Sequence, residues 1–281
     1  MRDFNGRVAV VTGAGSGIGR ALAQALAREG AHLALSDVNE VGLAETAASL
    51  PTGGGKVTTE LVDVADREAV EAHAARVIED HGRANLVINN AGVTVGASVA
   101  DLTPDDFRWI MGINFWGVVH GTQAFLPHLR ASGEGHVVNI SSVFGIIAVP
   151  GQSSYNASKF AVRGFTECLR QELEVEGAPV SATCVHPGGI QTNIARDARM
   201  VFGSIGNVQS REEAETEFRR MARHSPEKAA SLILRGVRRD KRRVLIGPEA
   251  YVIDWVQRLL PTAYQKILIW AARRQANTPV S

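Results

Sequence analysis

The stretch Val8-Ala9-Val10-Val11-Thr12-Gly13-Ala14-Gly15-Ser16-Gly17-Ile18-Gly19 decides the fold. Its first four residues form a short, continuous apolar run, which is typical of a strand buried on both faces of a parallel sheet. The glycines that follow let the backbone turn tightly and approach a phosphate with no Cβ in the way. A helix is predicted from about Gly17 to Glu29, and its first amide groups and dipole favour an anion. A plain glycine-rich turn is the alternative, but the strand before it and the helix after it favour a phosphate-binding loop.

A second strand is predicted at 32–35, and it ends at Asp37, which lies 18 residues beyond Gly19. An acidic residue at this place accepts hydrogen bonds from the ribose hydroxyls of a bound adenosine and repels a 2′-phosphate. The alternative role for Asp37 is a helix cap, but Asn39 already serves that purpose. Asp37 therefore favours a dinucleotide that lacks the 2′-phosphate.

Strand and helix signals continue to alternate along the chain. Further strands are predicted at 57–62, 86–88, 137–140, 180–185 and 244–246, and further helices at 67–80, 104–131, around 155–159 and at 226–239. Asn114 interrupts the apolar pattern of the helix at 104–131. The fold class predicted is α/β, a single doubly wound Rossmann fold with about seven parallel strands and helices on both faces.

Composition narrows the classes of protein further. At 281 residues and 45% apolar content the chain can bury a large core, and its formal charge of +1 provides no global field to recruit nucleic acid. Cys168 and Cys184 have no paired spacing, the N-terminus leaves no room for a signal peptide, and no apolar run approaches the ~20 residues of a membrane span. The eight histidines have no metal-binding spacing. We therefore expect a cytoplasmic protein without a metal site or a nucleic-acid partner.

A second informative stretch runs from Asn139 to Lys159. The strand at 137–140 ends in Ser141-Ser142, Tyr155 follows 13 residues after Ser142, and Lys159 lies four further on. A helix places Tyr155 and Lys159 on one face. A nearby cation lowers the pKa of a phenol from its usual value of about 10, so such a pair could exchange a proton with an alcohol or carbonyl oxygen. Taken alone, the pair fits the surface of an amphipathic helix equally well.

Six motifs occur together, in order and correctly spaced. They are Thr12 to Gly19, Asn89-Asn90-Ala91-Gly92, Asn114, Ser142, Tyr155-x-x-x-Lys159 and Pro187-Gly188. Each motif is modest, but the combination is specific, and over roughly residues 5 to 248 the chain resembles the short-chain dehydrogenase/reductase family.

The resemblance implies a role for each matching residue. Tyr155 would be the general acid/base, Ser142 would hydrogen-bond the substrate oxygen, and Asn114 would hold a water in a proton relay. Lys159 would bind the nicotinamide ribose and lower the pKa of Tyr155. Asp63 would meet the adenine, Asn90 the ribose region, and Ile190 and Thr192 the nicotinamide amide. The expected NAD-binding set is Gly13, Ser16, Gly17, Ile18, Gly19, Asp37, Asp63, Val64, Asn90, Ala91, Gly92, Tyr155, Lys159, Pro187, Gly188, Ile190 and Thr192.

The substrate pocket is less well specified. Its expected lining is Ser142, Phe144, Val149, Gln152, Tyr155 and Gly189. The segment 193–224 is predicted to cover it, with an apolar first part that contains Ile194, Met200, Val201, Phe202 and Ile205 and a charged part, 211–223, that could form a helical lid. A lid over an apolar pocket suits a hydrophobic alcohol or ketone, and steroid, retinoid and lipid-like substrates stay indistinguishable.

Three functions are compatible with these motifs. The first is an NAD-dependent dehydrogenase of a hydrophobic secondary alcohol, the second an NADP-dependent carbonyl reductase, and the third a cofactor-binding scaffold without turnover. The presence of Asn114, Ser142, Tyr155 and Lys159 argues against the scaffold, which does not require all four. The helices around 115–131 and 155–177 resemble those through which family members associate, so we expect a homodimer or homotetramer.

Residues 249–281 extend beyond the usual end of the family, so we expect a catalytic domain at 1–248 and an extension. Apolar residues recur there at helical spacing on both sides of Pro261: Val252, Trp255, Val256 and Leu259, then Tyr264, Ile267, Leu268 and Ala271. Two amphipathic helices are therefore predicted. Their apolar faces either pack on the same or a partner subunit or, because Lys266, Arg273 and Arg274 lie beside Trp255 and Trp270, contact a membrane interface.

Overall fold

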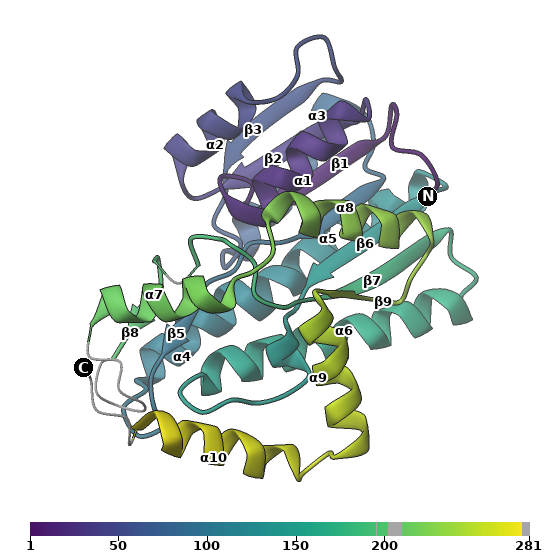
Figure 1. Ribbon diagram of the computed structural model, residues 1–281. Coiled ribbons are helices and arrows are strands. Elements are labelled where there is room, and N and C mark those ends of the chain that lie inside the picture. Colours follow the sequence, from purple (N-terminus) through teal and green to yellow (C-terminus); the bar gives the residue numbers. More distant parts are fainter. Residues whose placement is uncertain (195, 202–209, 277–281) are drawn as a thin grey trace.

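The computed structural model describes residues 1–194, 196–201 and 210–276 (Figure 1). The strands are β1 (Val8–Thr12), β2 (His32–Asp37), β3 (Val57–Leu61), β4 (Leu86–Asn89), β5 (Val95–Gly96), β6 (Gly135–Ile140), β7 (Val180–Pro187), β8 (Arg199–Met200) and β9 (Arg243–Ile246). The helices are α1 (Gly17–Arg28), α2 (Glu40–Ala48), α3 (Arg67–His81), α4 (Pro104–Met111), the π-helix η1 (Gly112–Trp116), α5 (Gly117–Ala131), the 3-10 helix η2 (Val143–Gly145), α6 (Ser153–Val175), α7 (Arg211–Met221), α8 (Pro226–Arg238), α9 (Pro248–Leu259) and α10 (Tyr264–Ala276).

The central sheet has seven parallel strands in the order β3-β2-β1-β4-β6-β7-β9, so the predicted fold is confirmed. The strand order reverses between β1 and β4, since the chain builds outward from β1 first in one direction and then in the other. Ligands of open α/β sheets bind at the carboxyl ends of the strands beside such a reversal. All the candidate motifs that follow strands therefore meet at one edge of the sheet.

Helices cover both faces of this sheet (Figure 1). Ala9 and Val11 face the cluster that α1 and α8 complete, whereas Val8 and Val10 face the cluster that α3, α5 and α6 complete. All four side chains are almost fully buried. Alternate residues of one strand thus serve two cores, and the continuous apolar run at 8–11 is the direct consequence.

Two features differ from the predicted elements. The expected helix at 104–131 is divided by η1, whose π geometry centres on Asn114. A small parallel sheet, β5 with β8, pairs Val95 with Arg199 and Gly96 with Met200. The two-residue strands carry no pattern that a sequence could reveal, and their pairing attaches the start of the 193–224 segment to the rest of the fold.

The expected lid and extension are described in part. The charged part of the lid contains α7, whereas Phe202 and Ile205 lie outside the described residues, as does the side chain of Ala271. The extension consists of α9 and α10, which flank Pro261. Tyr264 is buried, and its hydroxyl accepts a hydrogen bond of 3.2 Å from the Ala148 amide. The extension therefore packs against the connection between η2 and α6.

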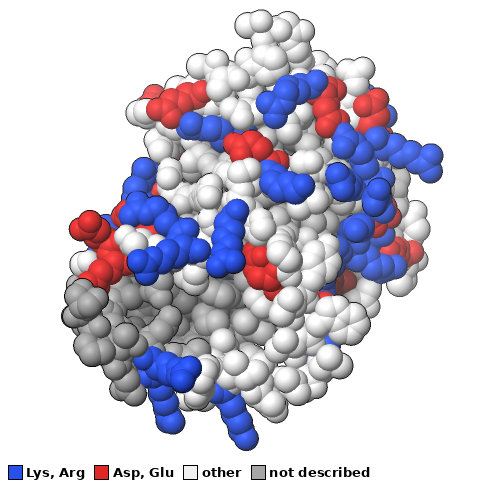
Figure 2. All heavy atoms as spheres, in the orientation of Figure 1, with Lys and Arg blue, Asp and Glu red and all other residues white. Residues whose placement is uncertain are grey.

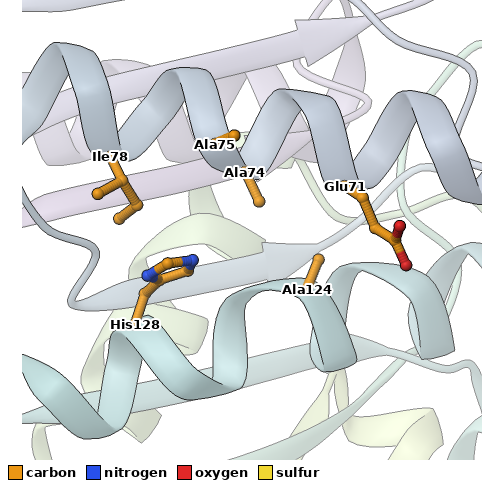
Figure 3. Close-up of a pocket in the computed structure, with 6 residues that line it drawn as sticks. All are labelled: Glu71, Ala74, Ala75, Ile78, Ala124 and His128. Carbon is orange, nitrogen blue, oxygen red and sulfur yellow. The ribbon is translucent and has the colours of Figure 1, made fainter.

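A pocket of about 370 Å³ lies between α3 and α5 (Figure 3). Glu71, Ala74, Ala75 and Ile78 line it from α3, and Ala124 and His128 from α5. None of the candidate site residues contributes to its wall. The pocket is a gap beside alanines where two helices pack and is not the candidate active site.

Three buried histidines make the fold sensitive to acid. Burial lowers the pKa of His136 to about 3 and the pKa values of His73 and His186 to about 4, from an ordinary value of 6.5. Between these values and 6.5 the unfolded chain binds protons that the folded chain does not, so the free energy of unfolding falls as the pH falls. Above pH 6.5 these residues are neutral in both states and add no pH dependence.

We predict that His136→Gln flattens this acid dependence. His136 is 1% exposed and lies 2.8 Å from the Thr183 hydroxyl through Nε2, and glutamine can keep a polar partner there without titrating. The slope of unfolding free energy against pH should decrease by up to about 1.4 kcal/mol per pH unit between pH 6 and 4. Urea denaturation at several pH values measures it, with the half-buried His128→Gln in α5 as control, and an unchanged slope would contradict the assignment.

Candidate active site

The glycine-rich loop between β1 and α1 is braced by residues from the end of β4. The Asn90 side chain donates hydrogen bonds of 3.0 Å to the Thr12 carbonyl and 3.1 Å to the Gly13 carbonyl. The Thr12 hydroxyl accepts from the Asn90 and Ala91 amides. The Asn90 side chain thus stabilises the loop through two backbone carbonyls, in addition to any contact it makes with a ribose. Thr12 is a positioning residue that the sequence analysis did not single out.

The loop leaves room for a phosphate because four of its residues, Gly13, Gly15, Gly17 and Gly19, lack a side chain. Gly13 and Gly17 have φ values of +64° and +51°, and a Cβ on Gly19 would lie 2.1 Å from the Gly13 carbonyl oxygen. Ser16 precedes α1 but makes no side-chain cap, and Ile18 packs partly against the main core. The first amides of α1 are therefore presented to an anion, and this cradle fits the pyrophosphate of a dinucleotide.

Asp37 faces the loop from the end of β2. Its Oδ2 accepts a hydrogen bond of 2.8 Å from the Gly15 amide, and its Oδ1 accepts one of 2.9 Å from the Asn39 amide. Arg20, the nearest cation in the loop, donates to the Gly15 carbonyl, the Thr46 hydroxyl and the Glu45 carboxylate. The end of β2 therefore presents the Asp37 carboxylate where an adenosine would bind. The nearby Arg20 guanidinium already forms hydrogen bonds and an ion pair within the protein.

The turn after β3 contains the two residues expected near the adenine. The Asp63 carboxylate accepts a hydrogen bond of 2.9 Å from the Ala65 amide, so it stabilises its own turn. Val64 is buried against Gly117, where an added Cβ would lie 2.7 Å from Val64 Cγ2. These contacts fix the turn at the same edge of the sheet as Asp37.

Ser142 and Tyr155 lie together at the end of β6. A hydrogen bond connects the two side chains, and the Ser142 hydroxyl accepts a second one of 3.1 Å from the Phe144 amide. The Phe144 ring meets the Tyr155 ring edge to face at a centroid distance of 6.1 Å. Because the amide occupies an acceptor site of Ser142, the hydroxyl proton can point at a neighbouring oxygen.

Lys159 is 3% exposed, and its ammonium donates a hydrogen bond of 3.0 Å to the Ile140 carbonyl. Nζ lies 5.6 Å from the centroid of the Tyr155 ring. Burial lowers the pKa of Lys159 to about 8, so the side chain is still mostly charged at pH 7. A Cβ on Gly92 would lie 3.4 Å from Nζ, which places the 89–92 turn directly beside it.

The pKa of Tyr155 differs from the expectation. Burial raises it to about 12, and the hydrogen bond with Ser142 only partly opposes this rise. Lys159 lies over the ring, and its charge does not offset the loss of hydration. Lowering this pKa therefore requires a further positive charge or hydrogen-bond donor at the phenol, beyond the lysine that the spacing identified.

Asn114 is fully buried within η1. Its Oδ1 accepts a hydrogen bond of 2.8 Å from the Val93 amide, and its Nδ2 donates to the Val93 carbonyl and to the Ser158 hydroxyl. The Ser158 hydroxyl donates in turn to the Tyr155 carbonyl. The Asn114 side chain thus connects the turn after β4 to α6, and both of its amide donors are already used.

The loop at 187–192 closes the cofactor side of the site. The Gly188 amide donates to the Ile246 carbonyl, and the Gly189 amide and carbonyl are bound by Glu249 and His224. The Ile190 side chain lies in the main core, whereas Cγ2 of Thr192 lies 3.0 Å from the Cβ position of Gly17. The loop from Pro187 therefore reaches the glycine-rich loop, and Gly189 could touch a substrate only through its Cα.

Apolar residues surround the substrate side of Tyr155. Val95, Ala97 and Ile110 form a buried cluster, and Val93, Leu102, Trp109 and Tyr155 pack against it. Gln152 accepts a hydrogen bond of 3.0 Å from the Thr94 hydroxyl, and the Val149 carbonyl accepts one from Asn156. Gln152, Val149 and Phe144 were predicted from the sequence, but the wall from residues 93–110 was not. Those residues carry no motif, and contacts between distant segments bring them here: the β5–β8 pairing, the Asn114 hydrogen bonds to Val93 and the bridge between Ala97 and Gln152.

Comparison with known proteins agrees with this geometry. The sequence pattern of the short chain dehydrogenase family matches residues 7–200. The chain belongs to this family. An oxidoreductase of Mycobacterium tuberculosis named SadH is 52% identical over 268 residues, which cover 95% of this chain and 96% of SadH. The dehydrogenase/reductase SDR family member 7B of Bos taurus is 32% identical, with coverage of 96% of this chain and 83% of the relative.

Solved structures of the family share the fold over most or all of the chain. A short-chain dehydrogenase/reductase from Burkholderia phymatum in complex with NAD superposes with a TM-score of 0.83 at 30% identity, covering 100% of both chains. Levodione reductase has a TM-score of 0.75 at 30% identity and covers 86% of this chain and 96% of its own. This chain is therefore an oxidoreductase of the short-chain dehydrogenase family with a site built for a nicotinamide dinucleotide.

Proposed function

We propose that the protein is an NAD-dependent dehydrogenase that interconverts a hydrophobic secondary alcohol and its ketone. The observation that carries this proposal is the position of Ser142, Tyr155 and Lys159. They lie between the phosphate-binding loop and an apolar cluster, where one group must meet both the cofactor and the substrate. Steroid-like, retinoid-like and lipid-like molecules all fit this description.

The chain's own residues supply the proton chemistry. Tyr155 takes the hydroxyl proton of the alcohol, or returns it to the ketone, while the Ser142 hydroxyl donates a hydrogen bond to the same oxygen. A bound nicotinamide would supply the hydride chemistry, and the positive charge of its oxidised form would oppose the rise that burial causes in the Tyr155 pKa. The Lys159 ammonium donates one hydrogen bond to the Ile140 carbonyl, and its other N–H groups would bind the ribose. A relay water would meet the Asn114 backbone, since its amide donors are used.

Asp37 supports NAD over NADP. Its carboxylate repels a 2′-phosphate, and the donors of Arg20 that could neutralise one are bound to Gly15, Thr46 and Glu45. An NADP-dependent carbonyl reductase, the second candidate, would need a cation here. A scaffold without turnover would not need the serine, tyrosine and lysine to converge.

We predict that Tyr155→Phe lowers kcat at least about 10³-fold while NADH still binds, because the ring stays and only the ionisable oxygen is lost. Turnover is measured by nicotinamide absorbance on any active alcohol, and binding by fluorescence. The exposed Tyr251→Phe in α9 is the matched control and should keep the normal rate. Near-normal turnover by Tyr155→Phe would exclude the proposed mechanism.

A second prediction concerns cofactor choice. The protein should have a lower KM for NAD than for NADP, and Asp37→Asn should decrease the NAD preference in kcat/KM about 10-fold or more. Asparagine keeps an acceptor for the Gly15 amide and removes only the charge. Asp105→Asn in α4 is the control. A wild-type KM that is lower for NADP than for NAD would refute this assignment.

We propose that the protein is at least a dimer. The helices η1 and α6 expose Trp116, Phe160 and Val175, which are apolar residues that a partner could cover. Light scattering at micromolar concentration should give at least twice the mass of one chain. A monomer would contradict the proposal.

We also propose that the extension contacts a membrane surface. The outward face of α9 carries Tyr251, Val252, Trp255 and Leu259, and that of α10 carries Ile267 and Trp270 beside Lys266, Arg273 and Arg274. In Figure 2 basic side chains project from the lower edge, where α10 lies, with no acidic residue beside them in that view. Apolar residues with tryptophans and cations are typical of helices that lie in an interface. Among the described residues no helix is long and apolar enough to cross a membrane.

A second group of basic residues lies upstream of the extension, at 235–243, and it contributes less to this surface. Arg238, Arg242 and Arg243 form ion pairs with carboxylates of their own chain.

Full-length protein should sediment with anionic phosphatidylglycerol vesicles at low salt, and the double substitution Trp255→Ser with Trp270→Ser should weaken this binding at least about 10-fold. Val41→Ser with Val99→Ser is the control, since both valines are exposed elsewhere. Wild-type protein that ignores such vesicles would exclude the membrane contact.

A further inference from the structure

Glu249 is the second residue of α9, and its carboxylate reaches back to the cofactor side of the site. Oε1 accepts a hydrogen bond of 3.2 Å from the Gly189 amide, and Oε2 lies 3.0 Å from Nε2 of His224. A Cβ on Gly188 would lie 2.1 Å from Oε1, and one on Gly247 would lie 2.3 Å from it. The carboxylate is thus enclosed by two glycines whose missing side chains leave room for it.

His224 binds the same loop through its backbone. Its amide donates a hydrogen bond of 3.1 Å to the Gly189 carbonyl, and its carbonyl accepts one of 2.9 Å from the Gln191 amide. The end of α7 also lies here, because a Cβ on Gly189 would lie 2.2 Å from the Met221 carbonyl oxygen. Glu249 and His224 therefore bind the Gly189 amide, the Gly189 carbonyl and the Gln191 amide of the loop at 187–192.

Two further contacts connect this loop to the reactive part of the site. His186 Nδ1 lies 2.9 Å from the Ser142 carbonyl oxygen, and Thr192 contacts Gly17. The loop is thus tied to the catalytic serine at one end and to the phosphate cradle at the other. Burial opposes ionisation of Glu249, but the hydrogen bond from His224, with that from the Gly189 amide, outweighs it and lowers the pKa of the carboxyl. Glu249 is therefore an anion at neutral pH.

We propose that Glu249 is a positioning residue that fixes the loop at 187–192 for the nicotinamide half of the cofactor. The extension would then contribute to cofactor binding without touching the cofactor. This inference rests on the proposed NAD-dependent function. The adenosine half meets Asp37 and the turn after β3, which Glu249 does not contact, so the two halves of the cofactor should respond differently to its loss.

The test compares two ligands in the intact protein. Glu249→Ala should raise the Kd for NADH about 10-fold, because a charged hydrogen-bond acceptor of the loop is lost, and should leave the Kd for ADP-ribose, which lacks nicotinamide, within about twofold. Glu249→Gln keeps an acceptor for Gly189 and should restore most of the NADH affinity. Glu227→Ala is the matched control, since Glu227 also follows a proline in the first turn of its helix, α8. It should change neither Kd.

Equal weakening of NADH and ADP-ribose, or no change for NADH, would overturn the proposal. If Glu249→Ala lowers the melting temperature so far that it is unfolded at 25 °C, His224→Gln is measured instead, and the same split between the two ligands is expected. Wild-type protein that binds no NADH would overturn both this inference and the proposed function. If Glu249→Ala shows the split but wild-type protein oxidises no alcohol, the result would count against the proposed function alone.

Discussion

The site depends on one steric constraint, the contact of three backbone segments at the start of α1. A Cβ on Gly19 would lie 2.1 Å from the Gly13 carbonyl oxygen, and a Cβ on Gly13 would lie 2.8 Å from Ala91 Cα. A side chain on Gly13 or Gly19 would therefore not fit between β1, α1 and the turn after β4. This close approach lets the Asn90 amide reach two loop carbonyls at once and presents the first amides of α1 to an anion. A single methyl group added to Gly13 or Gly19 would push the phosphate-binding loop away from the Asn90 side chain.

A chain of buried polar groups then positions α6 relative to that cradle. Asn89 donates 2.8 Å to Asn139 across the sheet, and Asn139 donates 3.0 Å to the Thr166 hydroxyl in α6. The Ser141 hydroxyl donates to the Lys159 carbonyl in the first half of the same helix. Buried polar groups are costly when unpaired, so these bonds favour one rotation of α6 about its axis. That rotation directs Tyr155 and Lys159 to the carboxyl edge of the sheet.

The parts of the fold that were predictable depend on short-range patterns. Apolar runs such as 8–11 indicate buried strands, glycines indicate the close approach, and the spacing of Tyr155 and Lys159 indicates a shared helix face. Their roles came from the family resemblance. Long-range contacts left no signal: Glu249 lies 60 residues from Gly189, and Tyr264 lies 116 residues from Ala148. The raised pKa of Tyr155 was also missed, because burial is a property of the assembled site and not of the spacing.

The extension faces two environments, and this explains its composition. Its inner residues are specific: Glu249 fits between two glycines, Ala250 is fully buried, and the Tyr264 hydroxyl binds one backbone amide beside the substrate loop. Its outer residues, among them Trp255 and Trp270, are large and exposed. The two faces belong to the same two helices, so the residues that bind the loop at 187–192 and the segment that follows η2 are part of the elements that carry the exposed apolar residues.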